Sequence, residues 1–520
     1  MIEMQKGLLT LLKELDAICK KHNITYYLEG GSLLGAVRHK GFLPWDDDVD
    51  LSITRDNFKK LLSVIDQELP ENRELYCYER FPGYLRDTVK YTNLDTTVLF
   101  PNHVLDGNAA GQHIDLFILD PVPSDAQAQE EYKKYATIYS ELLTPVYVLC
   151  DDIADYREEY EQYRQLMQQK GKQYVLDLLR QKLFTYEDSD ECDTYLLRWG
   201  NRHIFYPKAL FGTPVPLQFE DGYFPAPSQY YRFLRRQFGD SWMIIPDEEH
   251  QEDHSTFDNY NLPCKTFIAD YAPFIDYAAF EKAYVERKND RIQLLQEEKP
   301  IMQEQVYQHF ALKALELGDI IPALTQEAKE LLEKQDYPAL KAYFAPYYTA
   351  QLDGLFVNQG LAFEADPQVV YACALALTMC GQFGQGEKLI RASKAQTPEL
   401  EKLAEAIPDI RACVLATEEQ RFDDAKVLAE KWQSQYPLQL DLAVFMLRQA
   451  EREGQDVKEL TTRTQKLLDV YPESDHLMLL MGQLLEKQEN PEAKVWYDRC
   501  RAISRNGMIL MALPREENEK

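Results

Sequence analysis

Hydrophobic positions in the first 120 residues switch between helical and strand-like spacing. Apolar residues three and four positions apart predict helices over 5–21 and 55–68. Short apolar or alternating runs between and after them predict strands, which we place at 24–28, 49–53, 75–79, 87–91, 96–100 and 114–119. This mixture of helices and short strands predicts an α/β or α+β domain with a small mixed β-sheet.

The pattern changes after residue 125. Residues 125 to about 200 have helical spacing and are rich in Tyr, Gln and Glu, whereas residues 205–262 contain six prolines among many aromatic side chains. Because aromatic side chains bury large areas when they pack, we expect 205–262 to form a packed lobe and not a linker. A charged helix followed by Pro300 indicates a domain boundary near 285–300.

From about residue 300 to 510 the sequence predicts one helix after another. Turn dipeptides recur at intervals of 39, 35 and 35 residues, at Thr397-Pro398, Tyr436-Pro437, Tyr471-Pro472 and Asn506-Gly507. A period near 34 with helix–turn–helix units is typical of tetratricopeptide (TPR)-like repeats, and an ordinary helical bundle is the alternative. We therefore expect an all-α TPR-like repeat domain over 300–512, with a polar tail at 513–520. The preceding domain spans 1–290, with a core at 1–125 and a helical and aromatic lobe at 126–290.

Composition excludes several classes of protein. The net charge of the 520 residues is −29, so the chain lacks the basic surface that nucleic acids or anionic membranes attract. The nine cysteines are scattered without a Cys-x-x-Cys pair, and no run approaches the ~18–20 apolar residues of a membrane span. The first residues do not have the pattern of a signal peptide. We expect a cytoplasmic protein with free thiols, no nucleic-acid partner and no membrane span.

The candidate chemistry begins with Gly30–Ser32. These small residues predict a turn at which the backbone can approach a phosphate closely. If the strand that follows is extended back to span Asp46–Ile53, it carries Asp46, Asp48 and Asp50 with period two, so their side chains share one face. Neighbouring carboxylates repel one another, and a hard divalent cation such as Mg²⁺ or Mn²⁺ would relieve the repulsion. The pattern therefore predicts metal-assisted transfer of a phosphate-containing group.

Two other interpretations of the acidic run were weighed. A calcium loop of the EF-hand type begins with similar acids, but its sixth position is Leu51 instead of Gly and its twelfth is Asn57 instead of Glu. A solvated acidic turn is the other interpretation, because the chain has 86 acidic residues. A two-metal site needs a third acid, for which Asp115 within an apolar run is the candidate. Asp120 is explained as a turn residue, because a proline follows it.

Basic residues that can meet a phosphate come from two places. Arg38, His39 and Lys40 follow a short predicted helix at 32–38, and Lys90 lies in a predicted strand. Arginine offers a two-pronged donor and lysine a point charge. Each of them also has a simpler interpretation as a surface residue.

The run Gly30–Asp50 closely resembles the LicD family, which includes the fukutin-related proteins. Lys90, the segment Ile114–Phe117 and elements within 219–246 match further family positions, so the resemblance covers about residues 1–260. Members of the family transfer phosphocholine or a phospho-polyol from a cytidine diphosphate (CDP) donor onto a glycan. In bacteria the acceptor is a teichoic acid, a lipopolysaccharide or another cell-surface polysaccharide.

The resemblance implies an α+β nucleotidyltransferase-like domain with a small mixed β-sheet, followed by the all-α TPR-like region that lies outside the match. It implies metal-binding and catalytic roles for Asp48, Asp50 and Asp115. The residues expected to bind the phosphates or the nucleotide of the donor are Gly30, Gly31, Ser32, Arg38, Lys40 and Lys90.

We therefore expect a Mg²⁺- or Mn²⁺-dependent phosphotransferase that moves phosphocholine or a related phospho-alcohol from a CDP-activated donor to a glycan acceptor. A nucleotidyltransferase that uses a nucleoside triphosphate and releases pyrophosphate is the first alternative, because its metal site would look the same. A catalytically inactive interaction scaffold is the second. We expect the helical repeats to bind a protein partner or to self-associate.

Overall fold

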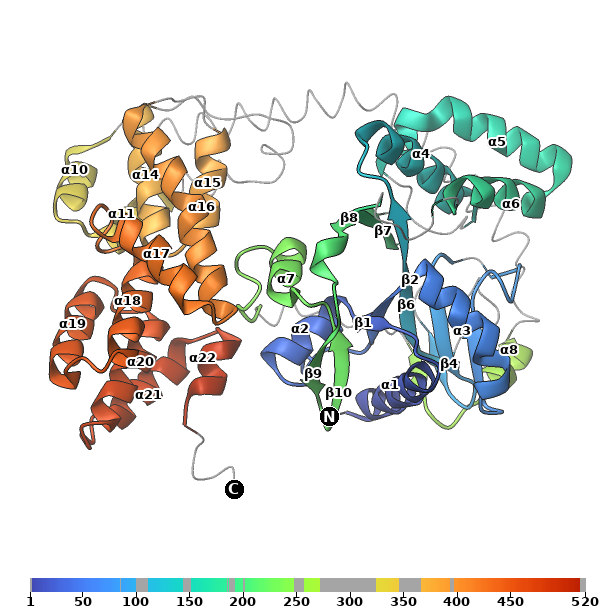
Figure 1. The fold of residues 1–520 in the computed structure, drawn as a ribbon, viewed down its shortest axis with the longest axis horizontal. Coiled ribbons are helices and arrows are strands. Elements are labelled where there is room, and N and C mark those ends of the chain that lie inside the picture. Colours follow the sequence, from blue (N-terminus) through green and yellow to red (C-terminus); the bar gives the residue numbers. More distant parts are fainter. Residues whose placement is uncertain are drawn as a thin grey trace. The chain divides into compact units, whose positions relative to one another are not determined.

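The computed structural model describes residues 2–84, 86–99, 111–143, 151–184, 186, 192–199, 202–246, 257–271, 324–345, 366–392 and 397–514. The contacts divide the chain into two compact units (Figure 1), which are Met1–Trp242 with Pro246–Glu298, and Met243–Ile245 with Lys299–Lys520. The domain boundary and charged helix expected at 285–300, and residues 515–520 of the expected tail, lie outside the described residues.

The first unit is built on a seven-stranded mixed sheet. Its strand order is β1 (Tyr26–Leu28), β2 (Asp50–Thr54), β6 (Gln112–Val122), β4 (Val89–Asn93) and β3 (Arg73–Tyr76). β7 (Thr194–Trp199) pairs with β6, and β8 (Arg202–Pro207) pairs with β7. β2 and β6 run parallel, and the other pairs of this sheet are antiparallel. The α+β class with a small mixed sheet is thus confirmed.

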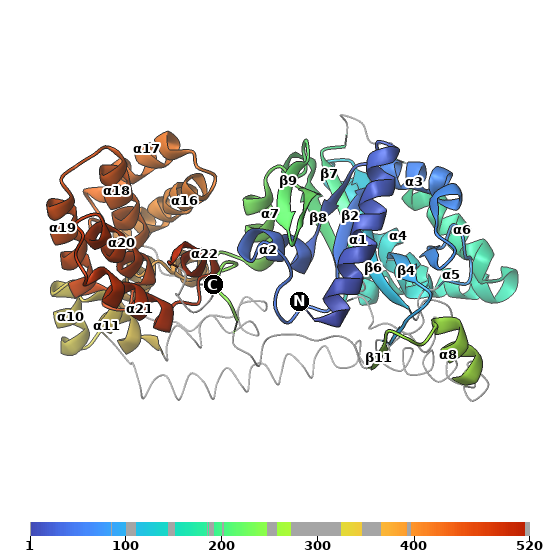
Figure 2. The same cartoon turned by 90° about the horizontal axis from the view of Figure 1, so that it is seen from below.

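The two faces of this sheet have different chemistry, because successive side chains of a strand point to opposite sides. α1 (Glu3–Lys21) and α3 (Arg55–Glu68) cover one face (Figure 2), where Leu51, Ile53 and Leu116 are fully buried. Thr54 accepts a hydrogen bond from the Asn57 N–H and thereby caps the start of α3. The opposite face carries polar side chains, namely Asp50, Ser52, Lys90, Thr92 and Asp115.

The described residues within 126–183, which are 126–143 and 151–183, are mainly helical, as their spacing predicts. They form α4 (Ala126–Leu143), the 3₁₀ helix η2 (Asp151–Tyr156), α5 (Arg157–Lys170) and α6 (Lys172–Leu183), which share a hydrophobic core. The expectation of helices up to about residue 200 is wrong at β7. Tyr195, Leu196 and Leu197 are all buried there, because this short apolar run extends the sheet beside β6.

The proline- and aromatic-rich segment is more regular than the sequence suggests. It contains η3 (Lys208–Leu210), the two-stranded sheet of β9 (Val215–Phe219) and β10 (Gly222–Ala226), and α7 (Tyr230–Phe238). Phe211, Phe219 and Phe233 are almost completely buried, which is consistent with the expected packed lobe. A second small sheet pairs β5 (Thr97–Leu99) with β11 (Phe257–Asn259), and α8 (Cys264–Tyr271) follows.

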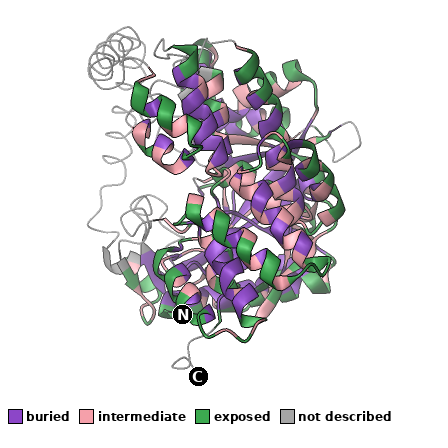
Figure 3. Cartoon of the chain, turned by 90° about the vertical axis from the view of Figure 1, so that its left-hand side faces the viewer, coloured by how far each residue is buried: buried purple, intermediate pink, exposed green. Residues whose placement is uncertain are grey.

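The second unit is helical wherever it is described, as expected. Thr397 and Asn506, from two of the predicted turn dipeptides, cap the helices that follow them. Buried and exposed positions lie on different sides of the helices (Figure 3), and the buried ones form two cores. The TPR-like assignment stays a prediction. The helices are α10 (Gln326–Glu333), α11 (Tyr337–Tyr343), α14 (Pro367–Met379), α15 (Phe383–Ala392), α16 (Pro398–Glu418), α17 (Phe422–Gln433), α18 (Leu440–Arg452), α19 (Val457–Val470), α20 (Asp475–Glu486), α21 (Ala493–Ile503) and α22 (Gly507–Ala512).

Two further properties concern the described residues as a whole. Their eight cysteines are free thiols, and all but Cys380 are buried. Within the described ranges, every helix is too short or too polar to cross a lipid bilayer.

Candidate active site

Three neighbouring strands place Asp50, Asp115 and Lys90 in one row across the polar face of the sheet. Asp50 lies opposite Asp115 in the parallel pairing of β2 with β6, and Asp115 lies opposite Lys90 in the antiparallel pairing of β6 with β4. The Nζ atom of Lys90 is 3.7 Å from Oδ1 of Asp115. Sheet topology therefore brings together residues that the sequence keeps far apart.

The acidic run before Asp50 is a loop and not the predicted strand. β2 begins only at Asp50, so Asp46 and Asp48 do not share a strand face with it. Gln5 of α1 holds the loop in place, because its Nε2 donates to the carbonyl oxygens of Asp46 (3.0 Å) and Leu43 (3.2 Å). The loop nevertheless keeps Asp46 and Asp48 close enough to Asp50 for their charges to act on it.

Negative charge accumulates around Asp50. Burial and the charges of Asp48, Asp115, Asp46 and Glu29 raise the pKa of this carboxyl well above its usual value. Glu29 directly precedes the helix that begins at Gly30 and is itself fully buried. Burial raises the pKa of its carboxyl to about 8. Such a cluster favours a nearby positive charge, because like charges in a poorly solvated site destabilise one another.

The residues fit a hard divalent cation by three observations. Their donor atoms are carboxylate oxygens, which Mg²⁺ and Mn²⁺ prefer. Oδ1 of Asp115 is buried and accepts no hydrogen bond. A Cβ atom on Gly30 would lie 3.0 Å from Asp50 Oδ2, and one on Gly31 would lie 2.9 Å from Asp46 Oδ2, so a larger residue at either position would displace these carboxylates. Within the described ranges no three His, Cys, Asp or Glu side chains lie close enough together to form a metal site.

The helix α2 (Gly30–Arg38) points its first turn at this cluster. The predicted turn at Gly30–Ser32 is wrong, because these residues already belong to the helix, and Gly30 enters it with a φ of +51° that glycine adopts at little cost. The Ser32 hydroxyl accepts a hydrogen bond from the Asp50 N–H at 2.9 Å and joins α2 to β2. Unpaired N–H groups at a helix N-terminus attract anions, so this end of α2 suits a phosphate.

Gly35 is a sensitive point of α2. A Cβ atom there would lie 2.3 Å from the carbonyl oxygen of Gly41, which is backbone and cannot turn aside. We expect Gly35→Ala to lower the free energy of unfolding of the first unit by about 1–3 kcal/mol, as overpacking does elsewhere. Urea unfolding measures this, with Gly83→Ala as the matched control because a Cβ atom there meets nothing within 4 Å. Equal stability of both variants would contradict the packing argument.

Arg38 and Lys40 lie at the other end of α2. A helix of this length separates its ends by about 12 Å, and the described contacts do not bring either residue to the acids. Arg38 Nη1 donates to the carbonyl of Trp242 (3.2 Å), and Lys40 Nζ donates to the carbonyl of Val37 (3.2 Å), where it helps to end the helix. Their assignment to the donor phosphates stays a prediction without support from these contacts.

Sequence reasoning missed two residues of the site. Nε2 of His113 is 2.5 Å from Nζ of Lys90, and His113 shares a strand face with Asp115, which its spacing of two could have indicated. Arg86 lies in a loop, where no periodicity singles it out. Burial lowers the pKa of Lys90 to about 7, and the positive charge of Arg86 acts in the same direction. The negative charge of Asp115 opposes this change.

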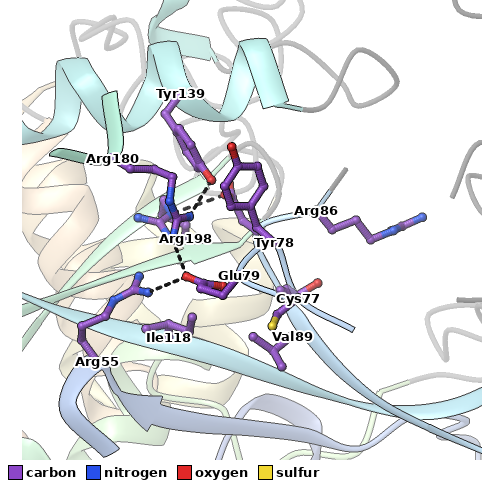
Figure 4. A pocket seen from close by; sticks show the side chains of 12 residues that line it. Arg55, Cys77, Tyr78, Glu79, Arg86, Val89, Ile118, Tyr139, Arg180 and Arg198 are labelled. Atoms are coloured by element: carbon purple, nitrogen blue, oxygen red, sulfur yellow. Dashed lines mark hydrogen bonds and ion pairs between the residues drawn. The ribbon is translucent and has the colours of Figure 1, made fainter. Parts of the chain in front are cut away.

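A small polar pocket lies on the face of the sheet opposite Lys90 and Asp115. Val89 and Ile118 line it, and their positions in β4 and β6 point their side chains away from the face that carries Lys90 and Asp115. Figure 4 shows Arg86 pointing away from the other three arginines of the pocket. Arg55 and Arg180 pair with Glu79, whereas Arg198 pairs with Asp87 and Asp120. These three arginines are held in ion pairs, and this pocket is thus part of the structural framework. It is lined by Arg55, Cys77, Tyr78, Glu79, Arg86, Asp87, Thr88, Val89, Ile118, Tyr139, Arg180 and Arg198.

Asp120 belongs to this network and is not a turn residue. It lies within β6 and is 1% exposed. Arg55 Nε and Arg198 Nη1 approach its carboxylate to 2.7 Å and 3.0 Å. The proline that follows is accommodated in the strand, and the carboxylate balances two buried guanidinium groups.

Comparison with known proteins agrees with this geometry. Residues 23–137 match the model of the LicD/FKTN/FKRP nucleotidyltransferase domain, which includes β1, α2, β2, β4 and β6. The lipopolysaccharide cholinephosphotransferase LicD of Haemophilus influenzae is 26% identical over 269 residues, which are 50% of this chain and 97% of that protein. An uncharacterised protein of Rickettsia prowazekii is 29% identical over 164 residues, 26% of this chain and 58% of the relative.

A third relative matches only a short segment. The ribitol 5-phosphate transferase FKRP of Mus musculus is 67% identical over 30 residues, which are 6% of each chain. The domain match and the two named relatives point to the same family. Residues 23–137 thus carry a domain of the LicD/FKTN/FKRP nucleotidyltransferase type, and two of the proteins that the chain resembles are named as transferases of phosphate-containing groups.

Proposed function

We propose that this enzyme transfers a phospho-alcohol, phosphocholine or ribitol phosphate, from a CDP-activated donor to a hydroxyl of a cell-surface glycan with the help of Mg²⁺ or Mn²⁺. The observation that carries the proposal is the row of Asp50, Asp115 and Lys90 beside the N-terminus of α2. The relatives support the choice of group, because one is named as a cholinephosphotransferase and another as a ribitol 5-phosphate transferase.

In the proposed reaction the acceptor oxygen forms a bond to the phosphorus that carries the alcohol, and the bond to the bridging oxygen of the diphosphate breaks. Cytidine monophosphate leaves with that oxygen, and the hydroxyl proton passes to a carboxylate of the cluster. Asp115 suits this role, since its buried Oδ1 accepts no hydrogen bond. Such a transfer depends mainly on positioning and on electrostatic stabilisation.

Each part of the site has a task in this reaction. The N–H groups of Gly31 and Ser32 at the start of α2 hold the phosphates, and Lys90 offsets negative charge that develops on the leaving group. Asp48, Asp50 and Asp115 would hold the cation. When bound, the cation supplies charge neutralisation between the donor's phosphates and the carboxylates.

The test is a screen of CDP donors. Purified wild-type protein is incubated with CDP-choline, CDP-ribitol or CDP-glycerol and extracted surface polysaccharide, and the products are identified by mass spectrometry. We expect cytidine monophosphate and a phospho-alcohol on the glycan. Release of pyrophosphate from a nucleoside triphosphate would instead favour a nucleotidyltransferase, to which the same site geometry is suited. No reaction, together with no binding of nucleotide or Mg²⁺ by calorimetry, would favour the scaffold.

Removal of divalent cations is expected to abolish transfer. The carboxylates around Asp50 would then repel the donor's diphosphate. We expect EDTA to lower the rate at least about a hundredfold, and Mg²⁺ or Mn²⁺ to restore it, consistent with the several kcal/mol that such ions supply in other enzymes. Unchanged turnover after dialysis against EDTA would refute the metal requirement.

We also propose that the helical second unit binds a partner protein or a second copy of the chain. Its amphipathic helices and two buried cores resemble the arrangement in which repeat proteins present an extended surface.

A further inference from the structure

We propose that His113 is a positioning residue, which holds the ammonium group of Lys90 beside Asp115 in the orientation that meets the donor's phosphates. The inference deepens the proposed function and rests on it for the chemistry. Its geometric basis is independent of the identity of the donor.

The partners of His113 determine which ring nitrogen carries the proton. Nδ1 lies 2.8 Å from the carbonyl oxygen of Gly111, which can only accept a hydrogen bond, so Nδ1 is protonated. Nε2 lies 2.5 Å from Nζ of Lys90, and because a neutral imidazole that is protonated on Nδ1 has its lone pair on Nε2, Nε2 accepts a hydrogen bond from Lys90. His113 is therefore neutral and fixed in one tautomer.

The sheet places Lys90 between two partners of different kinds. His113 and Asp115 are alternate residues of β6 with side chains on the same face, and Lys90 of the neighbouring β4 lies opposite Asp115. Nζ of Lys90 is 2.5 Å from His113 but 3.7 Å from Oδ1 of Asp115. The ammonium group is thus hydrogen-bonded to the neutral partner and stands back from the charged one.

This arrangement keeps two groups available for the reaction. Without His113 the attraction between opposite charges would draw Lys90 onto Asp115, and a contact ion pair would then occupy the carboxylate oxygen that the cation or the acceptor hydroxyl needs. A lysine side chain also has four flexible bonds, and a fixed acceptor restricts it before the substrate arrives. His113 therefore prevents a non-productive pairing and also orients the charge.

Two substitutions of His113 show whether its hydrogen-bond acceptor matters or only the volume of its side chain. His113→Leu has no acceptor, whereas His113→Gln retains an oxygen that Lys90 can donate to. We expect kcat to fall by about 10- to 100-fold in His113→Leu, because small displacements of catalytic groups cost this much. The KM for the glycan should change less than about threefold, and His113→Gln should recover a large part of kcat. His22→Leu, on the far side of the sheet at the end of α1, is the matched control and should keep wild-type activity.

A double-mutant cycle shows whether His113 acts through Lys90. If it does, His113→Leu should have little further effect on kcat, within about threefold, when Lys90 is already replaced by Met. The same cycle is measured for the affinity of CDP by calorimetry on the full chain, which requires no turnover. Thermal melting of each variant identifies loss of the fold.

The outcomes are distinguishable. Losses in kcat or in CDP affinity that simply multiply in the double variant, or a His113→Gln variant as poor as His113→Leu, would overturn the positioning role. A wild-type protein that transfers no group from any CDP donor would overturn the proposed function, while the cycle in CDP affinity still tests His113 and Lys90. If His113→Leu unfolds, the comparison of His113→Gln with wild type in the Lys90 and Lys90→Met backgrounds decides.

Discussion

Asp50→Asn is expected to abolish phosphotransfer and at the same time to stabilise the fold. The substitution keeps the shape of the side chain but removes the charge at the centre of the carboxylate cluster, so cation binding and turnover should fall at least about a thousandfold, as for a group that acts in the transition state. The donor screen by mass spectrometry measures the loss.

The gain in stability follows from the environment of Asp50. Burial and the neighbouring negative charges raise its pKa above the value in the unfolded chain. The unfolded state therefore loses its proton at a lower pH than the folded state, and ionisation disfavours folding increasingly as the pH rises above the unfolded pKa. Asn does not ionise, so Asp50→Asn should melt at a higher temperature than wild type at pH 7 in EDTA. Asp56→Asn, on the half-exposed surface of α3, is the control. Wild-type transfer by Asp50→Asn would refute the assignment of this residue.

The largest loss of stability is expected for Asp120→Ala. Asp120 is 1% exposed and binds both Arg55 and Arg198, which are buried themselves. Removing it would leave two guanidinium groups without their shared carboxylate, and breaking a buried pair costs about 3–5 kcal/mol. Urea unfolding of the first unit measures the change.

A surface ion pair provides the matched control for Asp120→Ala. Lys13 and Asp221 lie 2.7 Å apart but are largely exposed, so Asp221→Ala should cost no more than about 1 kcal/mol. If Asp120→Ala costs as little as Asp221→Ala, the ion-pair network does not support the sheet.

Local patterns predicted much of the fold because they are determined by neighbouring residues. The predicted helix at 55–68 has the same bounds as α3, whose apolar stripe and Thr54 cap lie within one stretch of chain. Alternation within β6 also placed Asp115 on the face opposite Ile114 and Leu116, as its spacing predicts. The resemblance to one family then indicated which acids belong together.

Features that depend on distant partners could not be predicted in this way. Asp120 precedes a proline, and the residues that explain it lie 65 and 78 positions away, at Arg55 and Arg198. His113 was not assigned a role because its contact with Lys90 follows from strand order, which periodicity does not specify. The sequence predicts a strand through the acidic loop because Asp46, Asp48 and Asp50 alternate along it. In the structure this spacing instead places the carboxylates of Asp46 and Asp48 near that of Asp50, and the backbone before Asp50 is not a strand.

The parallel pairing of β2 with β6 has a consequence for biosynthesis. Parallel neighbours cannot be joined by a tight hairpin, and here β3, β4 and β5 come between them in the chain. The ribosome must therefore release β6 before Asp50 can meet Asp115, and contacts between distant segments form late. A nascent or truncated chain that ends before Gln112 contains the glycine and aspartate run of residues 30–50 but lacks Asp115, so it cannot assemble the row of Asp50, Asp115 and Lys90.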